Sequence, residues 1–77
     1  MKTDERARAI SVLKDLFPRW EGHMGAKLAI DSLTLMEIVF AFETEFGVLM
    51  ADGSLHECET PEELLRLLNI QLLKKEG

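Results

Sequence analysis

The sequence predicts an all-α fold, a small bundle of three main helices and one short helix. Three segments of the 77-residue chain place apolar residues at helical spacing, with charged residues between them. Residues that favour helix starts and stops stand at the ends of these segments. Because a chain of this length buries only a modest core, we expect a single domain over residues 1–77.

The first helix is predicted over residues 3–16. The apolar residues at helical spacing are Ala9, Ile10, Leu13, Leu16 and Phe17. Pro18 ends the helix, and Gly22 and Gly25 break the loop that follows. The residues expected to anchor this loop to the core are Trp20, Met24 and Leu28.

The second helix is predicted to begin near Asp31 and Ser32, which are both favourable N-cap residues, and to end at Gly47. On a helical wheel one stripe is an ordinary core face, formed by Leu35, Ile38, Val39, Phe42 and Phe46. The opposite side carries a second apolar set, fringed by acidic and polar residues: Leu33, Met36 and Phe40, with Glu37, Glu43 and Thr44. Two readings remain open for this outward face: unusually complete burial in the bundle, or a docking surface whose carboxylates steer a partner.

The last helix has the clearest start signal. After a turn at residues 52–54 and a brief helical turn within 54–59, Thr60 is a predicted N-cap and Pro61 takes the first helical position. Glu63 completes a capping box with Thr60. Leucines supply the apolar faces of this helix, and two lysines near its end complement the helix dipole.

The charge distribution points to protein partners. The net charge is −5, and residues 28–65 contain no lysine or arginine. That span holds nine acidic residues: Asp31, Glu37, Glu43, Glu45, Asp52, Glu57, Glu59, Glu62 and Glu63. Such a field attracts a basic partner and repels phosphate backbones, so nucleic acid is not expected as a ligand.

The composition is that of a soluble globular chain, with 47% hydrophobic and 30% charged residues. No apolar run approaches the roughly 20 residues of a membrane span. The charged N-terminus has no apolar signal-peptide core, and a single cysteine, Cys58, fits a reducing compartment. We therefore expect a cytoplasmic protein, and a monomer.

Catalytic and metal sites find little support in the sequence. An Asp-Ser pair before an apolar helix is most often a simple cap, and no GxSxG motif surrounds Ser32. His23 and His56, the two candidate bases, are distant from Ser32 in sequence. Neither a zinc set nor a calcium loop has the required ligand spacing, and Cys58 reads as a small buried hydrophobe. We expect no enzymatic activity and no metal.

The segment Leu28–Val48, LAIDSLTLMEIVFAFETEFGV, resembles the modification segment of acyl carrier proteins. In that family an Asp-Ser-Leu tripeptide opens the second helix of a four-helix bundle, and the Thr60–Glu63 start falls where the family's last helix begins. The resemblance implies a small four-helix bundle of acyl-carrier type, with three longer helices and one short one. It also implies that Ser32 carries a covalent 4′-phosphopantetheine arm from coenzyme A, with Asp31 and Leu33 beside it.

The resemblance further assigns partner and cargo residues. The residues that fall where the family's outward helix contacts its enzymes are Leu33, Met36, Glu37, Phe40 and Glu43. The implied partners are a phosphopantetheinyl transferase and acyl-loading, condensing or acyltransferase enzymes with basic docking patches. By resemblance only, the residues at positions lining an acyl pocket are Ile38, Phe42, Leu55 and Cys58.

Three positions depart from the family pattern. Ala29 replaces a frequent glycine, Thr34 follows the tripeptide where an acidic residue is common, and Lys27 stands in a loop that is often acidic. These departures leave the attachment chemistry intact, but they favour a dedicated carrier as much as the housekeeping one.

The sequence thus predicts a free-standing acyl carrier protein that holds acyl intermediates as thioesters for fatty-acid or specialised lipid or polyketide synthesis. The alternatives are a peptidyl or aminoacyl carrier and a helical interaction domain without a prosthetic group.

Overall fold

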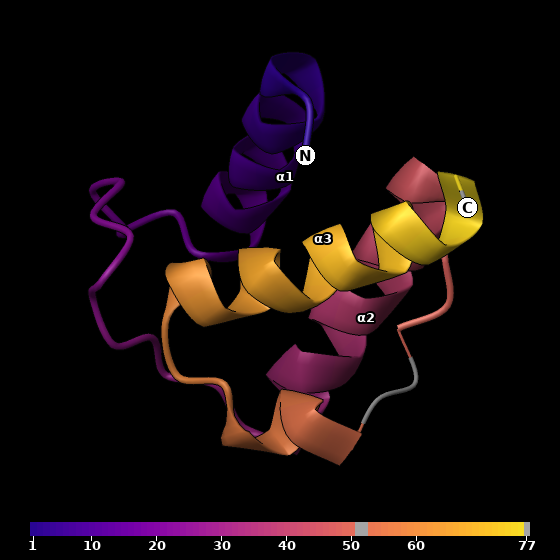
Figure 1. Cartoon of the computed structure of the whole chain (residues 1–77). Coiled ribbons are helices and arrows are strands. Elements are labelled where there is room, and N and C mark those ends of the chain that lie inside the picture. Colours follow the sequence, from indigo (N-terminus) through magenta and orange to yellow (C-terminus); the bar gives the residue numbers. More distant parts are fainter. Residues whose placement is uncertain (51–52, 77) are drawn as a thin grey trace.

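The computed structural model describes residues 1–50 and 53–76, and within these ranges the protein is all-helical, without a strand. The elements are α1 (Thr3–Leu16), α2 (Ser32–Phe46), the 3-10 helix η1 (Gly53–Glu57) and α3 (Pro61–Glu76) (Figure 1). The predicted all-α class and the three longer helices are confirmed, whereas the predicted short helix is a 3-10 helix. The predicted turn at 52–54 lies partly outside the described residues, because Asp52 is one of those not described.

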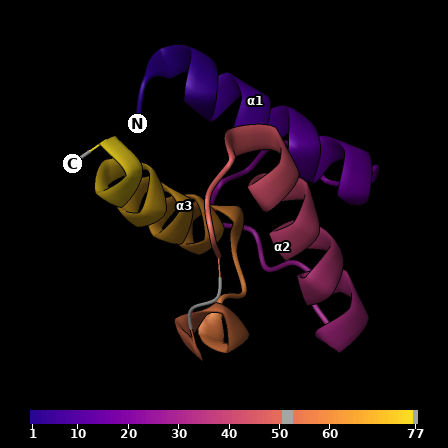
Figure 2. The same cartoon turned by 90° about the vertical axis from the view of Figure 1, so that its right-hand side faces the viewer.

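Figures 1 and 2 show α1 near the C-terminal end of α2 and η1 near its N-terminal end, with α3 passing between these two levels. The start of α2 and η1 are therefore neighbours in space, although about twenty residues separate them in sequence. This proximity sets which side chains surround the beginning of α2.

A single apolar core joins the three helices. Its buried members are Ala9, Leu13, Leu35, Ile38, Phe42, Phe46, Val48, Met50, Leu55, Cys58, Leu64, Leu65, Leu68 and Leu72. The α2 stripe predicted from the helical wheel supplies four of these, and its fifth member, Val39, is half-buried against the others. Phe42 and Phe46 meet edge to face, with ring centroids 6.1 Å apart. The core stripe of α2 is thus confirmed.

The start of α3 forms as predicted, with one difference. The backbone N–H of Glu63 donates to Thr60 Oγ1 at 3.3 Å, and the Thr60 hydroxyl donates to Glu63 Oε1 at 3.0 Å. In a standard capping box the glutamate also accepts the backbone N–H of the cap residue. Here it accepts the backbone N–H of Glu59 instead, at 3.3 Å. The same carboxylate therefore fixes the segment that leads into α3.

The loop between α1 and α2 is tied to this segment by two backbone hydrogen bonds. Leu28 N donates to Glu59 O at 2.7 Å, and Glu62 N donates to Met24 O at 3.0 Å. Met24, Leu28 and Trp20 are half-buried and pack against the core, which confirms their predicted anchoring role. The loop is consequently held in place immediately before the start of α2.

None of the helices in ranges 1–50 and 53–76 combines the length and the apolar character needed to cross a membrane.

Candidate functional site

Asp31 is the N-cap of α2, and Ser32 is its first residue. Asp31 has an extended backbone (φ −95°, ψ −178°), and its Oδ1 accepts the backbone N–H of Thr34 at 2.8 Å. Its carbonyl accepts the N–H of Leu35 at 2.9 Å, the first bond of the helix. Because Asp31 fills the capping role, the hydroxyl of Ser32 is not used for it. Ser32 is exposed, and its hydroxyl has no hydrogen-bond partner within the described residues.

The N-terminus of α2 also determines the charge state of its cap. The hydrogen bond from the Thr34 backbone lowers the pKa of Asp31 below its ordinary value of 3.8, because this bond favours the ionised carboxylate. A carboxylate therefore stands directly before Ser32 at neutral pH, at the positive end of the helix dipole.

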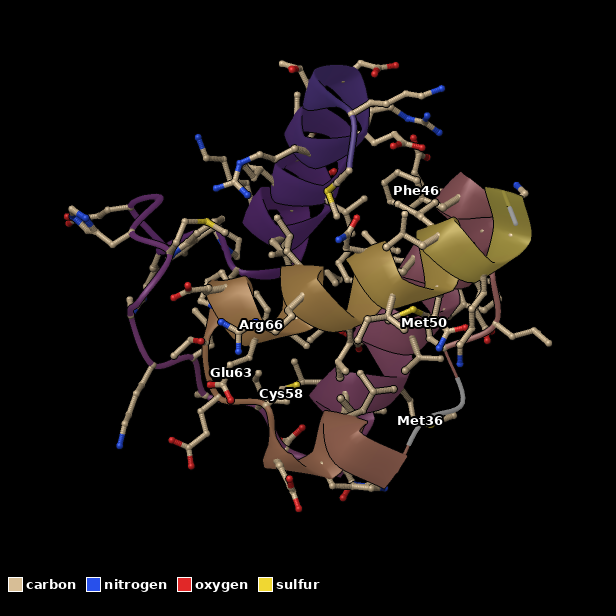
Figure 3. The ribbon with its side chains drawn as sticks, in the orientation of Figure 1. Met36, Phe46, Met50, Cys58, Glu63 and Arg66 are labelled. Carbon is tan, nitrogen blue, oxygen red and sulfur yellow. The ribbon has the colours of Figure 1, made fainter. Side chains whose placement is uncertain are left out.

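A hollow of about 290 Å³ lies beside Ser32. Its lining residues come from the start of α2, the two residues before it, and the η1 region: Ile30, Asp31, Ser32, Leu35, Leu55, His56 and Cys58. Cys58 belongs to the segment before α3, and Figure 3 shows its side chain on the side of that segment that faces α2. The hollow combines apolar walls with an open polar rim that includes the serine.

His56 belongs to this hollow, which the sequence did not suggest. The separation along the chain predicts that both histidines lie away from Ser32, but η1 brings His56 to the same hollow. His23 instead lies in the α1–α2 loop, with Nε2 3.8 Å from Glu21 Oε2. No hydrogen bond joins His56 to Ser32 in the part of the chain described, so the two do not form a nucleophile–base pair.

The outward face of α2 is exposed. The exposed fractions of Leu33, Met36 and Phe40 are 70%, 65% and 72%, and Glu37 is exposed as well. Figure 3 labels Met36 on the half of α2 that begins at Ser32, and Phe46 at the opposite end. Of the two readings of this face, complete burial within the bundle is therefore wrong for this chain. Three large apolar side chains instead form a surface that starts next to Ser32.

Glu43, predicted on the same face, is half-buried and has a structural bond. Its Oε2 accepts the backbone N–H of Met50 at 3.0 Å, across the turn that follows α2. This contact depends on how the chain returns after Gly47, which helical spacing alone does not reveal.

The four residues expected to line an acyl pocket divide into two pairs. Leu55 and Cys58 line the hollow beside Ser32. Ile38 and Phe42 have no exposed surface and lie in the core behind it. Leu35 and Ile30 line the hollow as well, a position that was not predicted for them from the sequence.

A second, larger hollow of about 580 Å³ lies within the α1–α2 loop. Its apolar lining residues are Phe17, Pro18, Trp20, Ala26, Leu28 and Ala29. Its charged and polar lining residues are Arg19, Glu21, His23 and Lys27. Trp20 and Leu28 are the predicted anchors of this loop, and the residue pattern carries no signal for a hollow between them.

No group of histidine, cysteine, aspartate or glutamate residues within the described ranges is arranged to hold a metal ion. The chemistry available at the site is that of an exposed hydroxyl at a helix start, next to a carboxylate, an apolar hollow and an apolar outer face.

Comparison with known proteins supports a specific assignment. A family described as "Phosphopantetheine attachment site" matches residues 25–68, more than half of the chain and including Ser32. No solved structure gives a significant match.

Three curated proteins are similar to the chain. The granaticin polyketide synthase acyl carrier protein of Streptomyces violaceoruber is 49% identical over 43 residues, which cover 56% of this chain and 51% of that protein. A probable acyl carrier protein of Caulobacter vibrioides is 39% identical over 51 residues, 66% of this chain and 59% of that protein. An acyl carrier protein of Petrotoga mobilis is 42% identical over 45 residues, 58% of this chain and 53% of that protein.

The matched segments thus span between half and three fifths of these relatives. They agree with the family match in pointing to carriers with a covalently attached 4′-phosphopantetheine group, not to catalysts. The chain therefore belongs to the acyl carrier protein family.

Proposed function

We propose that the protein carries acyl intermediates as thioesters on a 4′-phosphopantetheine arm attached to the hydroxyl of Ser32. The proposal rests on the different roles of Asp31 and Ser32 at the start of α2. Asp31 caps the helix, which leaves the Ser32 hydroxyl exposed and without a partner in the described residues. Ser32 also lies within the matched residues 25–68.

The residues around Ser32 fit such an arm. The phosphodiester would sit at the N-terminus of α2, where the helix dipole favours negative charge. The hollow of about 290 Å³ offers apolar contacts from Leu35, Leu55 and Cys58 within reach of the attachment point. When bound, the arm supplies the thiol chemistry, while this chain contributes orientation and recognition.

Attachment would be a phosphoryl transfer carried out by a separate transferase. The Ser32 oxygen forms a bond to the β-phosphorus of coenzyme A, the pyrophosphate bond breaks, and the nucleotide half leaves. The hydroxyl proton passes to a base of the transferase, which also supplies magnesium. No hydrogen bond joins His56 to Ser32 within the described residues, so we assign the base to the transferase.

Leu33, Met36 and Phe40, with Glu37 beside them, form the proposed docking face for the transferase and for acyl-loading, condensing or acyltransferase enzymes. Apolar side chains of this size fill small pockets, and nearby carboxylates steer basic patches toward them. Glu43 would contribute through the oxygen that does not bind Met50. The acidic middle of the chain supports partners of positive charge.

In this proposal residues 1–77 form one carrier domain, and η1 occupies the place of the short helix in a four-helix carrier bundle. Cargo would enter beside Leu55 and Cys58, with Ile38 and Phe42 deeper in the core. The similarity to a polyketide synthase carrier and to acyl carrier proteins supports fatty-acid or specialised lipid or polyketide synthesis. We also propose that the protein is monomeric and located in the cytoplasm.

The experiment is intact-protein mass spectrometry after incubation with coenzyme A, magnesium and a broad-specificity phosphopantetheinyl transferase. We expect the native chain to gain one phosphopantetheine and Ser32→Ala to gain none. Ser11→Ala is the matched control, because Ser11 is an exposed serine on α1, and it should gain the arm like the native chain.

The same experiment distinguishes the rival class. A helical interaction domain without a prosthetic group would show no mass gain, although the outward face of α2 would still bind a partner. A gain in Ser32→Ala equal to that of the native chain would contradict the assignment of Ser32 as the attachment residue.

A further inference from the structure

The hollow within the α1–α2 loop is about twice as large as the one beside Ser32, and it has a different chemistry. Its volume of about 580 Å³ falls in the range of small-molecule pockets, roughly 300–1,000 Å³. The larger part of its wall is apolar and includes the aromatic rings of Phe17 and Trp20. A hydrogen bond from the Trp20 indole N–H to His23 O, 2.9 Å long, holds that ring in place.

The rim of this hollow carries two cations and one carboxylate, that of Glu21, whose Oε2 lies 3.8 Å from His23 Nε2. Arg19 and Lys27 line it, in a chain whose next 38 residues contain no further lysine or arginine. Arg19 makes no ion pair or hydrogen bond with any side chain in the described ranges. Lys27 Nζ lies 3.5 Å from Glu59 Oε2, but both side chains are largely exposed, and such pairs contribute little. Both cations are thus able to bind an anion.

The loop that forms the hollow has a fixed position. Two backbone hydrogen bonds join the loop to the start of α3 and the segment before it. Leu28 N donates to Glu59 O, and Glu62 N donates to Met24 O. A hollow with walls held in this way is formed before any ligand arrives, so binding does not require ordering of the loop.

The hollow also lies close to Ser32 along the chain. Ala29 lines it, and Ser32 follows three positions later, so their Cα atoms are at most about 11 Å apart. A phosphopantetheine arm has more main-chain bonds between phosphorus and sulfur than three residues have. An arm on Ser32 is therefore long enough for its cargo end to reach the edge of the hollow.

We propose that this loop hollow, not only the hollow beside Ser32, receives the cargo, and that the cargo it favours is an aromatic acyl group bearing an acidic substituent. This inference rests on the proposed function of Ser32. The flat apolar body lies against Trp20 and Phe17, and the acidic substituent pairs with Lys27 and Arg19. Tethering keeps the cargo at a high effective concentration, so modest contacts suffice.

Trp20 is the sole tryptophan of the chain, and its fluorescence therefore reports directly on the hollow. The experiment loads three cargoes onto Ser32 from the corresponding acyl-coenzyme A and confirms each by intact mass. The terephthalic acid monothioester (4-carboxybenzoyl, called terephthaloyl here) carries an aromatic ring and one free acid. The para-toluoyl group replaces this acid with a methyl group, and hexanoyl lacks both features. We expect the Trp20 emission to change most with terephthaloyl, less with para-toluoyl and least with hexanoyl.

Two variants with matched controls locate the effect. Ala26→Leu fills the hollow and should abolish the response, whereas Ala7→Leu, on the exposed side of α1, should leave it intact. Lys27→Gln should lower the ratio of docked to undocked terephthaloyl about two- to fivefold, the effect of one exposed charge pair. Lys14→Gln, an exposed lysine on α1, should not change that ratio.

These measurements distinguish a failure of arm attachment at Ser32 from a failure of cargo binding in the loop hollow. No mass gain at Ser32 would overturn the proposed function and this inference together. A loaded arm with the same Trp20 emission for all three cargoes, or a response that survives Ala26→Leu, would overturn the inference alone. An equal response to terephthaloyl and para-toluoyl would overturn the part that requires an acidic group.

Discussion

Arg8 of α1 binds Glu45 of α2 through two hydrogen bonds: Nε donates to Oε1 at 2.8 Å, and Nη2 donates to the backbone carbonyl at 2.7 Å. Its guanidinium also lies 4.9 Å from the centroid of the Phe46 ring. From α3, Lys75 Nζ donates to the carbonyl of Phe46 at 2.8 Å. Two cations from the neighbouring helices thus cap the carbonyl end of α2, where the helix dipole is negative. The end with Ser32 remains exposed to partners.

Arg8→Ala should therefore lower the stability of the protein without affecting the attachment site. The expected loss is about 1 kcal/mol, because a partly exposed ion pair and a cation–π contact disappear together. Urea denaturation of the native chain and the variant measures this loss. Arg6→Ala removes an exposed arginine two positions earlier on α1 and should change stability by less than about 0.5 kcal/mol. Equal effects of the two substitutions would contradict a specific role for Arg8.

Substitution of Gly47 should lower the stability of the fold more than substitution of a loop glycine does. It ends α2 in the left-handed region (φ 64°), and an added Cβ would come within 3.1 Å of Lys75 Nζ. Gly47→Ala should therefore cost about 1–2 kcal/mol. Gly25 lacks a positive φ and has open space around it, so Gly25→Ala should be close to neutral. Thermal unfolding of both variants, followed by circular dichroism, tests the contrast.

The cap at Asp31 should make part of the stability dependent on pH. Because the folded-state pKa of Asp31 lies below its ordinary value of 3.8, the ionised cap stabilises the fold fully above that value. This stabilisation is lost as the pH falls through the lower, folded-state pKa. The difference in unfolding temperature between the native chain and Asp31→Ala should therefore be largest at neutral pH and shrink below pH 3.8. A difference that stays constant into that acidic range would refute the capping contribution.

The exposed face of α2 should affect recognition and leave stability unchanged. Phe40→Ala should lower kcat/KM for modification by the transferase about tenfold, the size of a moderate interface contact. Because Phe40 is 72% exposed, unfolding should barely change. Leu73→Ala on α3, also an exposed apolar residue, is the control and should be modified at the native rate. A similar loss in both variants would mean that exposed apolar area in general, and not this face, determines recognition.

The local parts of this structure could be predicted from the sequence, because neighbouring residues determine them. The cap at Asp31, the stop at Gly47 and the start at Thr60 each depend on residues within a few positions along the chain. The exposure of Phe40 and the burial of Phe42 follow from the helical period.

Features that depend on contacts distant in sequence could not be predicted in this way. His56 reaches the Ser32 hollow only because η1 lies beside the start of α2 (Figure 1). Glu43 meets Met50 only because of the path the chain takes after α2. The hollow around Trp20 exists because the loop is bonded to Glu59 and Glu62, thirty or more residues later.

Peptide mapping by tandem mass spectrometry of the transferase-treated chain tests directly whether Ser32 is the attachment residue. We expect one phosphopantetheine, located on Ser32, in the peptide that contains Asp31 and Leu33. Phosphopantetheine on any other hydroxyl, such as that of Thr34 or Ser11, or none on a chain that retains its helical fold, would contradict this expectation.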